Sequence, residues 1–530
     1  MQFSSSSRIL AAVLAITSAT VLTDAGRAQC VPQWGPGFSG INGGVTSCAT
    51  APNGDIVVAG LFTTIGGIAA NHIAVRSAAT GNWSALGTGV GNFVEVVTVR
   101  SNGNIVAGGN FVSAGGTAVT SIAEWNGTTW SALGAPMNPG ATVNAILELP
   151  NQDLIVGGQI STIGGVAVGN VARWNGTTWS PLATGIPVTG VNSDVYALAL
   201  MANGRVAIGG RFGTVSPNIA ALGIVEWNPA TGLFSQVGPA STTSAIGVGG
   251  EVRALALDAT GGLVVGGSFG NVSGTVPGTA IPARNVARWN GAFWSAMGGG
   301  LGLNGNELVR ALALHPSGRM IAGGEFPTDG FGGTLNFIAQ WNGAAWSPLG
   351  SGVGGFSPRV FSLTIAADSD IFTGGTFDTA GGIASFGLAS YDVCDAGARP
   401  YGNGCTGSAG PVALTAVTMP WVGTTFTARG TGMPAVSLAL GVWGNAQASV
   451  PLNTLLPQAL AGCDLLATPD LLLTLTPAGG TVTSQWAIPL SASILGGMVW
   501  HQLAVLEFGA GGAITAVTSS NGLELTIGGI

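Results

Sequence analysis

The sequence predicts an all-β protein whose larger part is a ring of repeated four-stranded units. A short apolar segment with a Gly-Gly or Ala-Gly pair recurs seven times, at a spacing of about fifty residues. Short alternating apolar runs and turn residues fill the spaces between the copies, and 90 of the 530 residues are Gly. Repeats of this length made of several short strands are typical of β-propeller blades. We therefore expect a seven-bladed propeller, followed by a second all-β domain.

Residues 1–28 are expected to be a secretory signal peptide. Arg8 precedes an apolar run at 9–22, and the small residues Gly26 and Ala28 lie just before the predicted cleavage site. No later segment reaches the roughly 18 uninterrupted apolar residues of a transmembrane helix. We therefore expect a secreted or cell-envelope-associated chain, extracellular or periplasmic, with no transmembrane segment after cleavage.

The charge balance bears on the class of partner. The formal net charge is -7, and all 15 basic residues are Arg. A mildly acidic chain of this kind is not expected to bind nucleic acid.

The first two strands of each repeat follow a hairpin pattern. An alternating apolar run such as VRALAL (309–314) is followed by a tight turn and a short run rich in Val and Ile. Asn-Gly turns, as at 53–54, 102–103 and 203–204, favour such hairpins because both residues tolerate positive φ. The second strands carry the doublet, in IVVAGLF (56–62), IVAGGNF (105–111), LIVGGQI (154–160), VAIGGRF (206–212), LVVGGSF (263–269), MIAGGEF (320–326) and IFTGGTF (371–377).

The third and fourth strands come after the doublet. A short strand such as VARWN (286–290) reaches a turn that leads to a second aromatic residue, here Trp294. Six third strands have a fourth strand after them, whereas the seventh, LASYD (388–392), has none. Trp34 near the N-terminus has the sequence context of a fourth strand. We therefore expect residues 31–36 to pair with this seventh strand and close the last blade, which leaves no open sheet edge.

Four of the five cysteines are expected to form two disulfide bonds. Alignment of the repeats places Cys30 and Cys394 at neighbouring positions of one junction between third and fourth strands, so a bond between them would hold the ring closed. Cys405 and Cys463 both lie in the C-terminal domain and are predicted to pair, and secretion permits both bonds. A Cys394–Cys405 bond is the alternative and would tie the linker instead. Cys48 falls in an apolar strand and is expected to be a buried free thiol.

The repeat ends near residue 395, and residues 396–530 are expected to form a β-sandwich. Runs such as PVALTAV, SLALGVW and HQLAVLEF alternate there with Gly, Pro and Asn turns. The predicted organisation is therefore a signal peptide at 1–28, a propeller at 29–395 and a sandwich at 396–530.

The blade pattern across residues 30–392 resembles the kelch-type propeller repeat, most closely at WNPATG (227–232). The series GGxF followed by IAxWNGxxWxxLG is also similar to secreted bacterial repeat proteins and to the fungal cortical cell-polarity markers. The ending, from YGNGCTGSAG (401–410) to SNGLELTIGG, looks like a module common on planctomycete secreted proteins. These resemblances imply a fold and bring no known active site.

No catalytic residue, metal site or cofactor is predicted. The chain has three His and three Tyr, and His72, His315 and His501 are expected to be isolated surface or turn residues rather than metal ligands. Copper oxidases of the galactose-oxidase type share a kelch-like ring, but the set of Tyr, His and cross-linked Cys that their chemistry needs is not found. The string GTGVG (87–91) lacks the Lys and the following helix of a phosphate loop.

Binding is expected at one face of the ring. The connections into the first strand and those after the second strand emerge on the same face, and they vary in length, most conspicuously at 270–285. Two variable positions per blade lie at the channel mouth there: the residue after the first Val of the first strand, and the residue between the doublet and Phe. The candidate ligand-binding residues are Glu95, Tyr196, Arg211, Arg253, Arg310 and Glu325, with Asn110, Asn144 and Gln159 at equivalent positions. The alternative is that these side chains pair with one another or are solvated at a channel wall.

The sequence thus predicts a secreted, non-enzymatic binding or surface-associated interaction protein. Its expected partner is an extracellular glycan, a protein or a cell-surface polymer. The alternative is a propeller-based carbohydrate-active enzyme or oxidase whose site is assembled in space, for example from Glu95, Glu325 and an Arg.

Overall fold

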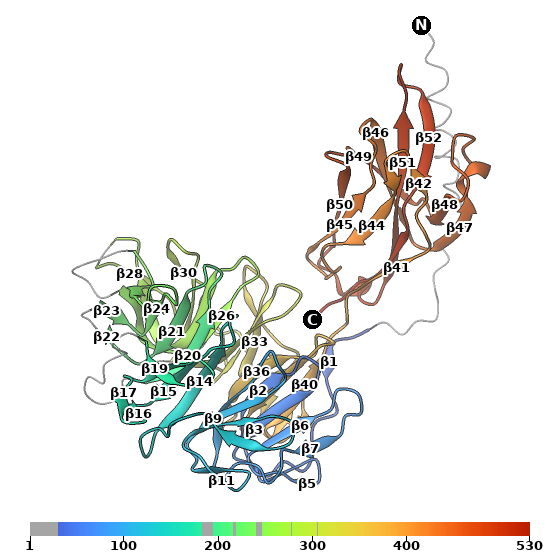
Figure 1. Cartoon of the computed structure of the whole chain (residues 1–530). Coiled ribbons are helices and arrows are strands. Elements are labelled where there is room, and N and C mark those ends of the chain that lie inside the picture. Colours follow the sequence, from blue (N-terminus) through green and yellow to red (C-terminus); the bar gives the residue numbers. More distant parts are fainter. Residues whose placement is uncertain (1–29, 183–193, 216–218, 240–245, 277, 305) are drawn as a thin grey trace. The chain divides into compact units, whose positions relative to one another are not determined.

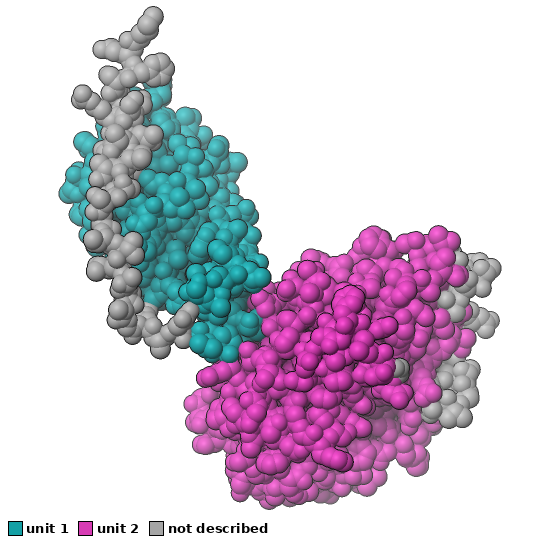
Figure 2. All heavy atoms as spheres, turned by 180° about the vertical axis from the view of Figure 1, so that it is seen from behind, with its two compact units in different colours: residues 1–32, 393–530 teal, residues 33–392 magenta. Residues whose placement is uncertain are grey.

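The computed structural model describes residues 30–182, 194–215, 219–239, 246–276, 278–304 and 306–530. The predicted signal peptide lies outside these residues. The chain divides into two compact units (Figure 2): residues 33–392, which we call the repeat unit, and residues 1–32 with 393–530, the C-terminal unit. In the described part of the chain, no helix has the length and apolar character needed to cross a membrane.

The repeat unit is built from antiparallel sheets that share one strand order, from an inner strand through two middle strands to an outer strand (Figure 1). The inner strands are β2 (Val45–Thr50), β8 (Val94–Val99), β14 (Thr142–Glu148), β20 (Val195–Leu200), β26 (Ile246–Leu257), β31 (Val309–Leu314) and β36 (Val360–Ile365). The second strands are β3 (Ile56–Gly60), β9 (Ile105–Gly109), β15 (Leu154–Gln159), β21 (Val206–Gly210), β27 (Leu263–Ser273), β32 (Met320–Gly324) and β37 (Ile371–Gly375). The third strands are β6 (Ile73–Arg76), β12 (Ile122–Trp125), β18 (Val171–Trp174), β24 (Ile224–Trp227), β29 (Val286–Trp289), β33 (Ile338–Trp341) and β40 (Leu388–Asp392). The outer strands are β7 (Trp83–Ala85), β13 (Trp130–Ala132), β19 (Trp179–Pro181), β25 (Phe234–Gln236), β30 (Trp294–Ala296), β34 (Trp346–Pro348) and β1 (Gln33–Trp34).

Each glycine doublet has two packing roles. A Cβ atom on the first glycine, as at Gly209, would lie 2.6 Å from Cγ1 of Val252 on the inner strand of the next sheet. A Cβ atom on the second, as at Gly210, would lie 2.0 Å from the carbonyl oxygen of Asp194, just before the inner strand of its own sheet. The same two close approaches recur in the other doublets. The first glycine therefore lets neighbouring sheets pack closely, and the second lets the backbone of the inner strand come near.

The aromatic residues of the third and outer strands join neighbouring sheets. Trp125 and Trp130 face each other across two strands, with ring centroids 5.6 Å apart. Nε1 of Trp130 donates to the carbonyl of Leu86 at 2.8 Å, and Leu86 directly follows the outer strand of the preceding sheet. Equivalent bonds to the preceding sheet are made by Trp179, Trp294 and Trp346. These tryptophans therefore serve as packing residues between sheets.

The N-terminal segment supplies the outer strand of the last sheet. β1 pairs antiparallel with β40, so that Gln33 lies opposite Asp392 and Trp34 opposite Tyr391. Figure 1 shows β1 beside β40, although the two strands are at opposite ends of the repeat unit's sequence. The pairing predicted from the missing fourth strand is therefore present. Each inner strand also contacts the inner strand of the next sheet, and β36 contacts β2.

The connections after the second strands are more regular than the sequence indicated. Several contain a two-stranded hairpin, such as β4 (Thr64–Ile65) with β5 (Ile68–Ala69). The equivalent pairs are β10 (Ser113–Ala114) with β11 (Thr117–Ala118), β16 (Thr162–Ile163) with β17 (Val166–Ala167), β22 (Thr214–Val215) with β23 (Ile219–Leu222), and β38 (Thr379–Ala380) with β39 (Ile383–Ala384).

The predicted loop at 270–285 is wrong in part. β27 continues to Ser273 and pairs with β28 (Ala280–Pro282). The cause is apolar burial beyond the doublet, because Val272 lies opposite Val248 on the extended β26 and both side chains are fully buried.

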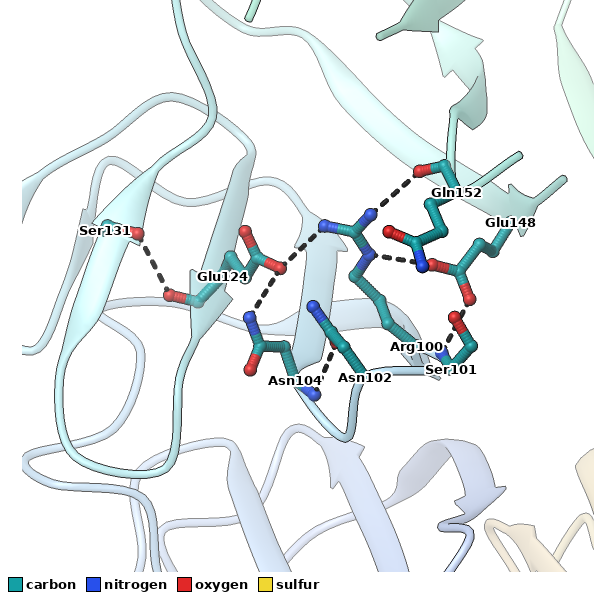
Figure 3. Close-up of polar contacts among 8 residues, drawn as sticks. All are labelled: Arg100, Ser101, Asn102, Asn104, Glu124, Ser131, Glu148 and Gln152. Carbon is teal, nitrogen blue, oxygen red and sulfur yellow. Dashed lines mark hydrogen bonds and ion pairs between the residues drawn. The ribbon is translucent and has the colours of Figure 1, made fainter. Parts of the chain in front are cut away.

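A buried ion network joins the sheets of β8 and β14 (Figure 3). Arg100, which directly follows β8, is 8% exposed. Its Nη1 donates to Oε1 of Glu124 at 2.9 Å, and its Nε donates to Oε1 of Glu148 at 3.0 Å. Nη2 donates to the carbonyl of Gln152 at 2.8 Å. One guanidinium thus holds two carboxylates that come from different sheets.

The C-terminal unit has two larger sheets around one core. One sheet has the order β41 (Gly397–Tyr401), β53 (Gly522–Thr526), β51 (Met498–Phe508), β46 (Ser437–Gly444), β49 (Leu471–Leu475), with β52 (Ile514–Ser519) beside β51. The other has the order β44 (Ala413–Ala416), β45 (Thr425–Thr431), β50 (Thr481–Ala487). Phe426 from the smaller sheet and Trp443 and Leu503 from the larger belong to one apolar cluster. The short elements are β42 (Thr406–Gly407), β43 (Gly410–Pro411), β47 (Gln447–Pro451), β48 (Asp464–Ala467) and two 3-10 helices, η1 (Leu452–Thr454) and η2 (Ala492–Ile494).

The cysteines are arranged as the sequence predicted. Cys30 is bonded to Cys394 and Cys405 to Cys463, with Cα–Cα distances of 5.8 Å and 5.1 Å. The alternative Cys394–Cys405 bond is therefore wrong. Cys48 is a buried free thiol. Burial raises its pKa to about 12.

Candidate binding site at the inner strands

Every inner strand has a β-bulge, which lies within the first three residues of the strand except in β26, where an N-terminal extension of the strand precedes it. In β26, Val252 lies opposite Gly267 and Ala254 opposite Gly266, so Arg253 between them has no partner in the ladder. A bulge turns its extra residue out of the regular pattern and redirects that side chain. The bulged residues, one on each inner strand, are Thr46, Glu95, Asn144, Tyr196, Arg253, Arg310 and Phe361.

The bulged residues line one cavity of about 290 Å³. Because each occupies the same position in a different sheet, the repeat itself brings them together. The positions of Glu95, Asn144, Tyr196, Arg253 and Arg310 were predicted from sequence. Thr46 and Phe361 were missed, although they also follow the first Val of their strands and therefore had the same signal.

Two arginines of the cavity are held in place by carboxylates and aromatic rings. Arg253 donates from Nε and Nη2 to the two carboxylate oxygens of Glu251, at 3.0 Å and 3.3 Å, and its guanidinium carbon lies 3.9 Å from the ring centroid of Tyr196. Arg310 donates from Nε to Oε1 of Glu325 at 2.6 Å, and it lies 5.1 Å from the ring centroid of Phe361. Paired carboxylates and cation–π contacts fix both side chains.

Glu95 is the anionic residue of the cavity wall. Within the described residues its side chain makes no hydrogen bond and no ion pair. Burial raises the pKa of the Glu95 carboxyl, and the positive charges of Arg310 and Arg253 oppose that shift. The cavity therefore holds one carboxylate whose acceptor atoms are not used by the protein.

Tyr196 is a hydrogen-bonding and stacking residue. Its hydroxyl donates to Oδ2 of Asp194 at 2.8 Å. Burial, followed by this hydrogen bond, raises the pKa of Tyr196 to about 12. The phenol therefore stays protonated across the physiological pH range, and its ring face is covered by Arg253.

The second set of predicted residues surrounds the cavity without lining it. Glu325 pairs with Arg310 and lies 3.6 Å from Nε of Arg359. The side chain of Arg211 is exposed, as is that of Gln159. Asn110 donates from Nδ2 to the carbonyl of Ala141 and to Oγ1 of Thr142, both at 3.3 Å. In part, then, the predicted residues pair with one another, which was the alternative reading of these positions.

The loops that enter the inner strands and the hairpins after the second strands lie on one face. Bridges join the two kinds of connection at Val90 with Ala114, Met137 with Ile163, Leu301 with Asp329, and Val353 with Ala380. The bulges are at the starts of the inner strands, so the cavity lies at this end of the sheets. The shared face that antiparallel strands require is therefore confirmed.

The expectation of surface or turn histidines is wrong for His501, which lies in the strand β51. The side chains of His315 and His501 are both fully buried. Burial lowers the pKa of each to about 4. His315 does belong to a turn, but its Nε2 lies 3.0 Å from the carbonyl of Ser369, and the contact with a neighbouring sheet buries it.

The chain was compared with known families and structures. No protein-family model and no curated protein matches it. The WD40 repeats of RRP9 are similar in structure, at 13% identity and a TM-score of 0.42, over 68% of this chain and 98% of that chain. The WD40 β-propeller domain of Doa1 is similar at 10% identity and a TM-score of 0.31, over 68% and 96%. PorZ, a bacterial surface component of the type-IX secretion system of Porphyromonas gingivalis, is similar at 10% identity and a TM-score of 0.28, over 91% and 81%. At these values the likenesses say nothing of ligand or activity, and the assignment as an all-β propeller-type repeat protein rests on the repeated sheets themselves.

Proposed function

We propose that this chain is a secreted, non-enzymatic binding protein whose ligand site is the cavity lined by the bulged residues. The observation behind this proposal is the convergence of one redirected side chain from every inner strand on one polar cavity. A bulge interrupts the hydrogen-bonded ladder, and bulges are enriched beside functional sites because they aim side chains. Six residue types occupy the seven copies of this position, with Arg in two of them, and such variation on a repeated scaffold favours a binding role.

The proposal treats residues 29–395 as a seven-bladed, kelch-like propeller that the N-terminal strand closes, and residues 396–530 as a β-sandwich. The pairing of β1 with β40 and the contact of β36 with β2 support the closure. Two sheets around a shared apolar core support the sandwich.

Secretion or attachment to the cell envelope is part of the proposal. The two disulfides support an oxidising compartment. The signal-like sequence at 1–28 agrees with this, as does the Cys30–Cys394 bond directly after the predicted cleavage site.

The partner is proposed to be an extracellular glycan, a protein or a cell-surface polymer that approaches the loop face. Exposed aromatic residues lie on the connections of that face, with Phe331 82% and Phe356 96% exposed and Phe386 51% exposed. Large apolar side chains left in solvent at one end of a rigid scaffold favour an interaction surface.

A binding screen tests this function. Residues 29–530 would be applied to a glycan array and to bacterial cell envelopes, beside an Arg253→Gln/Arg310→Gln variant. The matched control is Arg205→Gln/Arg288→Gln, because these arginines also pair with acids but lie at the opposite ends of the strands. We expect binding that the first variant loses and the control keeps. Equal binding by both variants would exclude the cavity, and turnover of any captured glycan would replace the proposal with the enzymatic alternative.

A further inference from the structure

The charges of the cavity are placed on opposite sides of the ring of inner strands. The contacts run in the order β2, β8, β14, β20, β26, β31, β36 and back to β2. Glu95 on β8 is therefore three strands away from Arg253 on β26 in one direction and three strands away from Arg310 on β31 in the other. The carboxylate faces the arginine pair across the cavity that all three residues line.

The arginine side of the cavity offers hydrogen-bond donors. Arg253 uses Nε and Nη2 on Glu251, and Arg310 uses Nε and Nη2 on Glu325. Within the described residues, the Nη1 amine of neither arginine donates to the protein. Each guanidinium is thus fixed on one edge and keeps donors on the other, the arrangement that binds a carboxylate oxygen.

The opposite side offers acceptors. The Thr46 hydroxyl has one hydrogen, which lies within reach of the carbonyls of Val94 and Ala59, so only its lone pairs remain. Asn144 donates from Nδ2 to the carbonyl of Val195 at 3.2 Å, which leaves Oδ1 as a free acceptor on that amide. Glu95 lies on the strand between these two, and its carboxylate has no partner in the described residues. Three neighbouring strands therefore present mainly acceptor atoms, and the second Nδ2 hydrogen of Asn144 is the donor among them.

We infer that the cavity binds a sugar-acid unit end-on, with the carboxylate of the sugar on Arg253 and Arg310 and its ring hydroxyls on Thr46, Glu95 and Asn144. This inference rests on the proposed binding function and names its ligand class. A cavity of about 290 Å³ has room for one sugar ring. A sugar acid has several hydroxyl donors on one edge of its ring and a carboxylate on the other. The hydroxyls match the acceptors on one side of the cavity, and the carboxylate matches the arginine donors on the other.

Two other ligand classes fit the cavity less well. A neutral sugar usually stacks on an exposed aromatic face, but the rings of Tyr196 and Phe361 are each covered by a guanidinium. A free amino acid has its ammonium and carboxylate groups on a single carbon. An ammonium beside the carboxylate would lie near the two arginines rather than near Glu95, which is three strands away from each of them.

Calorimetric titration of residues 29–530 tests the ligand class. The probe is methyl glucuronoside, and its uncharged methyl ester is the matched comparison because the ring and hydroxyls are identical. We expect the acid to bind at least tenfold more tightly than the ester. The Arg253→Gln/Arg310→Gln variant should lose this preference, Glu95→Ala should weaken binding of both probes at least threefold, and Arg205→Gln/Arg288→Gln should leave both affinities unchanged. Thermal unfolding of each variant confirms that it is folded.

The outcomes separate the inference from the function on which it rests. Equal affinity for acid and ester, no binding of either, or tighter binding of alanine than of the glucuronoside would overturn the sugar-acid assignment. If the envelope screen still showed binding that depends on Arg253 and Arg310, the binding function would stand with another ligand. If that screen were also negative, both would be wrong.

Discussion

The second glycine of each doublet leaves room for the bulged backbone of the inner strand. A substitution at Gly267 tests this role. A Cβ atom at Gly267 would lie 2.0 Å from the carbonyl oxygen of Glu251, two residues before Arg253. We expect Gly267→Ala to lower the free energy of unfolding of the repeat unit by at least about 2 kcal/mol, because the strands must separate. Gly270→Ala is the control, since no atom lies within 4 Å of its Cβ position; its effect should stay within about 0.5 kcal/mol in urea denaturation. Equal losses would contradict the role of the doublet.

The two buried histidines should make the stability of the protein sensitive to acid. Burial lowers the pKa of His315 and of His501 from 6.5 to about 4. Between these pH values the unfolded chain binds more protons than the folded chain. The stability that depends on each neutral histidine is therefore complete above pH 6.5 and decreases as the pH drops towards 4. The full difference is about 3 kcal/mol for one histidine. In denaturation curves from pH 7 to pH 4.5, His501→Gln should flatten this decline for the C-terminal unit, whereas His315→Gln, in the repeat unit, should leave the decline of the C-terminal unit unchanged. A pH dependence unchanged by His501→Gln would show that other groups cause it.

Among the elements of the fold, the strands could be predicted from the sequence, whereas the bulges within them could not. Alternating apolar residues, Asn-Gly turns and doublets locate each hairpin because they depend on local backbone conformation and burial. A bulge depends on the register between two strands, and VRALAL reads as a regular strand until it is paired with the doublet. The cavity positions could be predicted from their variation among copies, and the same pattern marks Thr46 and Phe361, which also follow the first Val of their strands. The ion pairs of Arg253 with Glu251 and of Arg310 with Glu325 likewise appear only in three dimensions.

The Arg100 network predicts strong coupling between two sheets. Arg100→Met keeps much of the side-chain volume but leaves Glu124 and Glu148 without their cation, and the side chains of these acids are 18% and 14% exposed. We expect a loss of about 3 kcal/mol in urea denaturation, because breaking a buried pair leaves an uncompensated charge. Adding Glu124→Gln and Glu148→Gln should restore part of it. Arg173→Met is the comparison: Arg173 is 32% exposed and, among the described residues, pairs with Asp153 alone, so one carboxylate instead of two loses its cation and the loss should be smaller. If Arg100→Met lowered the free energy of unfolding as little as Arg173→Met, the network would not contribute to stability.

At the scale of the whole molecule, the repeat unit could be predicted in more detail than the C-terminal unit. Seven copies of one pattern can be aligned, so the absence of a fourth strand after Tyr391 and its presence at Trp34 are visible in the sequence. Residues 396–530 have no internal copies. Their apolar runs indicate strands, but the order in which those strands pair depends on long-range contacts that no local pattern records. Both disulfides could be predicted, because five cysteines leave few pairings once one is assigned to an apolar strand.

The Cys30–Cys394 bond predicts how the repeat unit holds its N-terminal strand. β1 has two residues, Gln33 and Trp34, so its pairing with β40 provides few hydrogen bonds. The disulfide joins the chain just before β1 to the chain just after β40, across a sequence separation of 364 residues. By the chain-entropy model, closing a loop of this size stabilises the folded chain by about 6 kcal/mol. We expect Cys30→Ser/Cys394→Ser to lower the free energy of unfolding of the repeat unit by several kcal/mol on this model, and to expose the segment around β1 to limited proteolysis. Cys405→Ser/Cys463→Ser, which opens a separation of 58 residues, should act on the C-terminal unit alone. If cleavage near β1 were equally slow in both double variants, the short strand would hold its place without the disulfide, and the bond would have no role in keeping β1 paired with β40.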